Sequence, residues 1–78
     1  MGTEVTHRAV LLTQLAQIKR HIAKGQQQIK QQSAIVAGLD EYGRDSTNAR
    51  HLLVQFEEML AFYTTDRDQL LRELRVTE

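Results

Sequence analysis

The chain contains no cysteine and no proline, and it has only two Tyr and two Phe side chains as aromatics. Without cysteine, neither disulfides nor thiolate metal sites are available to stabilise it. Without proline, the strongest helix breaker is missing and long helices are permitted. A domain of 78 residues lies near the lower limit for folding alone. We therefore expect a partner chain to supply the missing stabilisation.

Net charge and long apolar runs are also lacking. Ten basic and ten acidic side chains balance, so the overall charge gives no argument for nucleic acid or an acidic membrane as a partner. No apolar run approaches the roughly 18 residues of a membrane span, and the N-terminus shows no basic segment followed by an apolar core. We expect a cytoplasmic protein that does not enter a membrane.

Good helix formers dominate the sequence, and β-branched residues never alternate with polar ones over the length of a strand. This pattern predicts an all-α fold. We expect a first helix over about residues 4–42, a loop over about 43–45 and a second helix over about 46–75. Gly43 suits a left-handed residue just past the first helix, and Asp45 or Ser46 suits the N-cap of the second. So short a loop makes the helices antiparallel neighbours, which predicts one coiled-coil-like helical hairpin over residues 1–78.

Apolar positions recur at intervals of three and four along both expected helices, as in a heptad seam. Gly25 and Gln32 depart from this pattern in the first helix. A polar residue in a seam either fixes the register or lies half-exposed at the edge of a bundle. The predicted seam comprises Leu15, Ile18, Ile22, Ile29 and Val36 in the first helix and Leu53, Phe56, Leu60, Tyr63 and Leu70 in the second.

Folding the chain about Arg44 places Gly25 opposite Phe62 and Tyr63, so that the small residue leaves space for an aromatic ring. Each apolar stripe is wider than a two-helix contact, which leaves about eight large apolar side chains partly exposed. An exposed stripe of this length marks an association surface. We therefore expect two copies to form a four-helix bundle, with the seam residues and Gly25 at the interface.

Patterns that carry catalysis or ligand binding are missing. The three histidines do not have the spacing of metal ligands. No glycine-rich phosphate loop follows a strand, and no serine has a plausible base and orienting group. The sequence predicts a non-enzymatic protein with no cofactor, metal or small-molecule substrate.

The first half of the chain is basic and the second half acidic. Residues 5–39 include five basic side chains and no acidic one. Four of these cations and the neighbouring glutamines form a polar strip that suits weak, salt-sensitive contacts to a phosphate backbone. These cations are Lys19, Arg20, Lys24 and Lys30. Because no aromatics are interleaved with them, a solvated helix face explains the strip equally simply.

The function itself is not specified by the sequence, and three hypotheses stay open. The first is a homo-oligomeric structural or protein-interaction module. The second is a small nucleic-acid-associated regulator that uses the basic face of the first helix. The third is an adaptor whose apolar stripe accepts a helix of a different protein.

Several segments resemble a group of short proteins from rhizobial-type α-proteobacteria. The shared pattern is HIxxG, a glutamine-rich helical turn, a GxDT-like cap, LLxxFE and an Arg-x-x-Leu-Leu tail. The matching segments here are His21–Gly25, Gly43–Ser46, Leu52–Glu57 and Arg67–Leu71, with serine in place of the usual threonine at position 46. The resemblance covers roughly residues 17 to 75. It implies a bacterial origin and a helical fold, and it assigns no functional residue.

Overall fold

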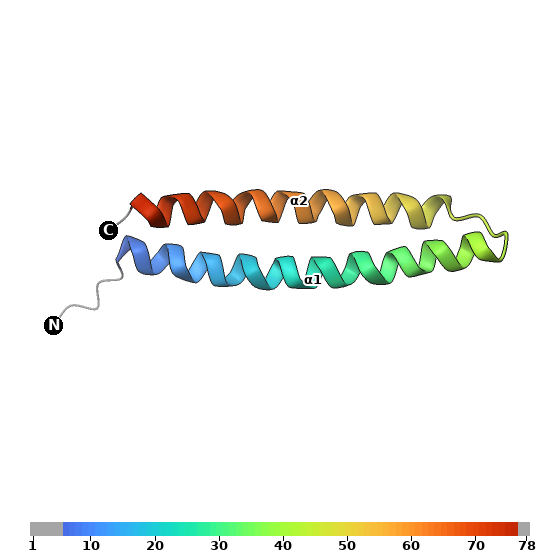
Figure 1. The fold of residues 1–78 in the computed structure, drawn as a ribbon, viewed down its shortest axis with the longest axis horizontal. Helices are drawn as coiled ribbons and strands as arrows, with labels where there is room; N and C mark the ends of the chain where they lie inside the picture. Colours follow the sequence, from blue (N-terminus) through green and yellow to red (C-terminus); the bar gives the residue numbers. More distant parts are fainter. Residues whose placement is uncertain (1–5, 77–78) are drawn as a thin grey trace.

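The computed structural model describes residues 6–76, which form two helices and the loop between them (Figure 1). Helix α1 runs over His7–Glu41 and helix α2 over Thr47–Val76. The helices lie side by side and antiparallel, and the Cα atoms extend over 65 × 22 × 13 Å. The predicted all-α helical hairpin is confirmed. The predicted start of the first helix, at about residue 4, lies outside the described residues, and the other three predicted bounds agree to within one residue.

Helix α1 has a side-chain cap at its start and a glycine cap at its end. The Thr6 hydroxyl accepts a hydrogen bond from the backbone N–H of Ala9 at 3.0 Å. Gly43 has φ of +65°, a left-handed conformation that costs glycine little. The N–H groups of Gly43 and Arg44 then bond back to the carbonyls of Asp40 and Leu39, at 3.1 and 2.8 Å. This is the Schellman arrangement, which satisfies two otherwise orphaned carbonyls.

The start of α2 divides the predicted capping role between two residues. The Asp45 carboxylate accepts hydrogen bonds from the hydroxyl of Thr47 at 2.6 Å and from its backbone N–H at 3.0 Å. These two bonds, the hydroxyl bond first, lower the pKa of Asp45 below its ordinary value. The resulting stabilisation is present above the unfolded-state pKa and is lost as the pH falls through the folded-state pKa.

Ser46 connects the loop to α1 instead of capping α2 with its side chain. It is buried, and its hydroxyl donates to the Asp40 carboxylate at 2.6 Å. The same hydroxyl accepts from Nε of Arg50 at 2.9 Å, and the Arg50 guanidinium also pairs with Asp40. The ion pair is largely exposed and contributes little alone. The buried hydroxyl therefore holds the beginning of α2 beside the last full turn of α1.

Replacing Ser46 with alanine removes both hydrogen bonds of this connection. We expect Ser46→Ala to lower the free energy of unfolding by about 1 kcal/mol, measured by urea denaturation at fixed protein concentration. Ser33→Ala is the matched control, because Ser33 is exposed within α1 and alanine is the better helix former there. Equal stabilities of the two variants would contradict the assigned role of Ser46.

The core is a narrow row of side chains between the two helices. Leu11 and Leu15 cluster with Leu74 and Leu70 near the chain ends, and Ile22 and Val36 continue the row along α1. These α1 positions follow the heptad spacing predicted from the sequence. Among residues 6–76, no side chain is completely enclosed. Two helices in contact therefore shield a single seam and nothing deeper.

Polar contacts across the seam fix how the helices are aligned. Gln32 is only 7% exposed, and its side-chain amide donates to the backbone carbonyl of Ala49 at 3.0 Å. Nearer the chain ends, the Arg8 guanidinium donates to the carbonyl of Leu74 at 3.1 Å. A buried amide without a partner is costly, so the Gln32 bond favours this alignment over a slipped one.

The predicted partner of Gly25 is wrong by close to one helical turn. A Cβ atom built on Gly25 lies 3.4 Å from Cδ1 of Leu60, whereas the sequence prediction placed Phe62 and Tyr63 there. Phe62 is instead 66% exposed. The reason is that the chain folds back closer to α1 than about Arg44, so that Ser46 lies beside Asp40, whereas folding about Arg44 would place it beside Tyr42. Gly25 therefore meets an aliphatic side chain and holds no aromatic ring.

The space around Gly25 accepts one methyl group. We expect Gly25→Ala to raise the free energy of unfolding by up to about 1 kcal/mol, because alanine is the better helix former and 3.4 Å is an ordinary contact distance. Gly38→Ala is the control, since a Cβ there has no neighbour within 4 Å. The two gains, read from thermal unfolding, should match closely. A loss at Gly25 alone would show that Leu60 approaches more closely than described.

Candidate interaction surface

The predicted interface residues mostly lie inside the hairpin. Leu15, Ile22 and Val36 are buried between α1 and α2. The other eight are half-buried along the same seam: Ile18, Gly25, Ile29, Leu53, Phe56, Leu60, Tyr63 and Leu70. The contact between the two helices therefore already covers much of the surface of these residues. A surface available to a second chain has to include the positions that flank this seam.

The flanking positions carry many exposed apolar side chains. Five large hydrophobic residues are buried within residues 6–76, and ten are exposed. The exposed ones are Val10, Leu12, Ile35, Tyr42, Leu52, Val54, Met59, Phe62, Leu71 and Val76. Where such side chains gather on one face, they mark interaction sites in folded proteins. Six of them widen the apolar stripes beyond the heptad seam in the sequence: Leu12, Ile35, Leu52, Met59, Phe62 and Leu71.

One side of the hairpin is hollowed between the helices. A first hollow near the chain ends is lined by both helices, from Gln14 to His21 on α1 and from Tyr63 to Glu73 on α2. A second hollow continues from it past Gly25 and Met59. His21 and Tyr63 line both hollows, and their rings stack at a centroid distance of 4.9 Å with 9° between planes. The two hollows therefore belong to one shallow groove.

Heptad spacing identifies the other residues on the same side of the hairpin as this groove, because positions seven apart recur on the same side of a seam. We call this side the groove face. On α1 its rows are Gln14, His21, Gln28 and Ile35, and Val10, Gln17, Lys24 and Gln31. On α2 its rows are Leu52, Met59, Asp66 and Glu73, and Gln55, Phe62, Gln69 and Val76.

The groove face carries few charged side chains. Its rows contain six glutamines and six large apolar side chains, but only one lysine and two carboxylates. Met59 is 54% exposed and Phe62 is 66% exposed, near the middle of α2. Glutamine amides both donate and accept hydrogen bonds without a net charge. A surface of this composition can meet an identical surface without repulsion between like charges.

The opposite side of the hairpin is charged. The equivalent flanking rows there include Lys19, Arg50 and Glu57, and the ion pair of Arg67 with Asp68 lies on α2 at 3.0 Å. Its apolar residues are Leu12, Val54 and Leu71. Charged side chains are depleted at the centre of protein interfaces. The groove face is therefore the better candidate for association.

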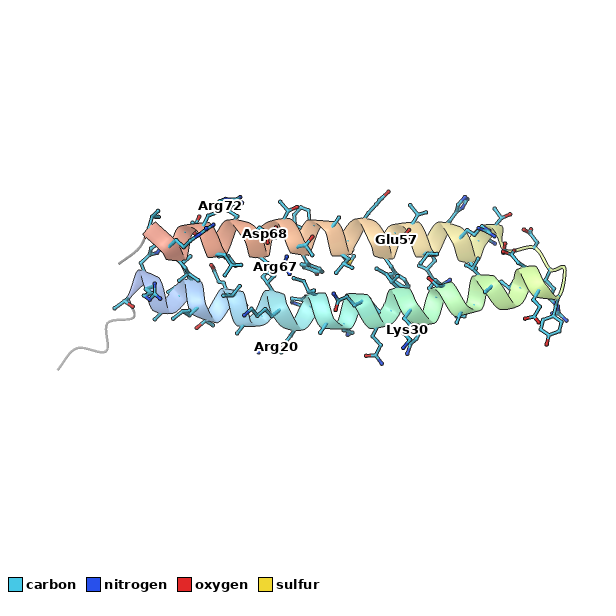
Figure 2. All side chains as sticks on the ribbon, viewed as in Figure 1. Arg20, Lys30, Glu57, Arg67, Asp68 and Arg72 are labelled. Carbon is cyan, nitrogen blue, oxygen red and sulfur yellow. The ribbon has the colours of Figure 1, made fainter. Side chains whose placement is uncertain are left out.

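The basic residues of α1 lie mainly on its outward side. Lys19, Arg20, Lys24 and Lys30 are all exposed, and Figure 2 shows Arg20 and Lys30 at the edge of α1 that faces away from α2. At 100° per residue the four cations spread over roughly 140° of the helix surface. A single phosphate backbone would touch only some of them at once. Lys24 also lines the groove.

Other classes of site find little support in the described part of the chain. Within residues 6–76, no three His, Asp or Glu side chains gather closely enough to hold a metal ion. Neither α1 nor α2 combines the length and apolar character that crossing a bilayer requires.

Comparison of the chain with protein-family models, with curated proteins and with solved structures finds no match. The resemblance to short proteins of rhizobial-type α-proteobacteria therefore stays a prediction.

Proposed function

We propose that the protein is a non-enzymatic, cytoplasmic interaction module in which two copies associate through their groove faces into a four-helix bundle. The observation that supports this most directly is the excess of exposed over buried large apolar side chains, ten against five. Six of the ten lie on the groove face, where a second layer of helices would remove them from water. Burying one such side chain fully is worth about 1.5–3 kcal/mol.

A second copy is favoured over an unrelated partner by the chemistry of the groove face. Neutral amides and apolar groups are complementary to themselves, which a twofold interface requires. The few charges are divided by helix, with Lys24 on the α1 side and Asp66 and Glu73 on the α2 side. This division lets one copy offer both signs to the other.

The central test is sedimentation equilibrium of the whole chain over a hundredfold concentration range, with helicity followed by circular dichroism. We expect a dimer for the native chain. Met59→Lys combined with Phe62→Lys introduces two charges per copy at the centre of the groove face. We expect this variant to weaken dimerisation at least about a hundredfold, because each lost apolar contact occurs twice in a symmetric dimer.

Val54→Lys is the matched control for this experiment. Val54 also lies on α2 and is 48% exposed, but it belongs to the charged side. It should dimerise like the native chain. A folded native chain that stays monomeric throughout the concentration range would contradict the proposal. In that case the groove face would be open to a helix of another protein, as an adaptor requires.

One observation keeps a nucleic-acid role as the second candidate. Residues 7–39 of α1 carry exposed cations and no carboxylate. We expect any binding to be weak and to fall steeply with salt. Electrophoretic mobility of duplex and single-stranded probes at low salt tests it, with Lys19→Glu, Arg20→Glu and Lys30→Glu combined as the variant. These three residues lie outside the groove face, so the same variant should dimerise normally. If the native chain shifts neither probe, the nucleic-acid candidate is removed.

A further inference from the structure

The groove face is not uniform along its length. Its half nearer the loop carries Ile35 and Leu52 beside three uncharged glutamines, and Met59 and Phe62 lie near the middle. Its half nearer the chain ends is mainly polar: Gln14, Gln17, His21, Asp66, Gln69 and Glu73 line the first hollow. Apolar side chains return only at the terminal edge, with Val10 and Val76. A copy that covers this face therefore has a preferred direction.

Two hairpins stacked face to face with twofold symmetry have two arrangements. With the axis parallel to the helices, both loops lie at the same end and α1 of each copy lies over α2 of the other. With the axis across the helices, the loops lie at opposite ends and each helix lies over its own counterpart. The two arrangements bury different combinations of side chains.

Overlap of like surface favours loops at the same end. In that arrangement Ile35, Leu52 and Met59 of one copy meet the equivalent apolar half of the other over its full length. The polar halves of the two copies also face each other, and the terminal valines, Val10 and Val76, meet across the interface. With loops at opposite ends and the hairpins centred, the half with Ile35 and Leu52 covers the half with Asp66 and Glu73. Sliding the copies to match the apolar halves leaves both terminal valine edges uncovered.

Charge favours the same arrangement. Lys24 lies at the middle of α1, which spans His7–Glu41. Loops at opposite ends set α1 against its own copy, so that Lys24 approaches a second Lys24 when the hairpins are centred. Loops at the same end set the Lys24 side of α1 against the helix that carries Asp66 and Glu73. Like charges at an interface oppose association, and opposite charges select the orientation.

We infer that the occupant of the groove face is a second copy aligned with its loop at the same end, so that α1 of each copy covers α2 of the other. This inference rests on the proposed dimer and adds its polarity. One consequence is that both loops, each with an exposed Tyr42, form a single end of the bundle. A ligand of that end would meet two equivalent sites side by side.

Electron–electron distance measurements between spin labels test this polarity directly. The native chain has no cysteine, so Arg44→Cys in the loop carries one label per copy. Loops at the same end predict a distance below about 30 Å, given helix spacings of 8–10 Å. A centred opposite-end arrangement predicts about 40 Å or more, since each helix is on the order of 45–50 Å long. An opposite-end arrangement slid to match the apolar halves predicts roughly 25 Å, because each loop then lies near the middle of the other hairpin, so a second distance is needed to recognise it.

A mixed dimer provides the complementary measurement. One copy is labelled at Arg44→Cys and the other at Arg72→Cys, which Figure 2 places at the outer edge of α2 near the chain ends. Here the same-end arrangement predicts a distance of roughly 45 Å, and the opposite-end arrangement a much shorter one. Each labelled variant is first checked for native helicity and dimer strength.

The outcomes separate this inference from the proposed function. A short loop-to-loop distance with a long mixed distance supports the same-end dimer. A long loop-to-loop distance, or a short mixed distance, in a dimer overturns the polarity and leaves the proposed association intact. A monomer by sedimentation, with no intermolecular dipolar signal, overturns both.

Discussion

Two helices touch along one line, and this geometric limit governs the rest of the molecule. A seam between two cylinders shields one narrow row of side chains, here from Leu11 to Val36 on α1. Both apolar stripes are wider than that row, so their margins remain in water. The hairpin thus has a definite shape but an incomplete core. Association is the general remedy for such a chain, because further helices can cover the margins.

Apolar contacts stabilise the hairpin, and polar contacts determine the register in which its two helices align. A leucine seam sliding by one turn still places leucine against leucine. Gln32 makes such slippage costly, because its amide would lose the Ala49 carbonyl while still buried. Ser46 also fixes the alignment, at the loop end of the hairpin, because its hydroxyl joins the loop to Asp40. The register is therefore specified by a few hydrogen bonds and not by buried area.

The different roles of apolar and polar contacts explain which features of the fold could be predicted from the sequence. Helix bounds were predictable because spacing, the absence of proline and Gly43 all act locally. The register was not, since the choice of Leu60 over Phe62 as the neighbour of Gly25 depends on a tertiary fold-back. The sequence also indicated that the stripes were too wide. Which edges of the two stripes share one groove depends on how the helices are rotated relative to each other. The residues that line the hollows show this rotation.

The two sides of the hairpin have chemistries that together would limit the size of an assembly. The groove face offers amides and apolar groups, which lose little when they meet their own kind. The other side offers charges such as Lys19 and Glu57, whose desolvation opposes further stacking. In the proposed bundle the first surface is covered and the second faces solvent. An assembly with one such closed interface ends at two copies, because a twofold contact uses the same patch on both partners.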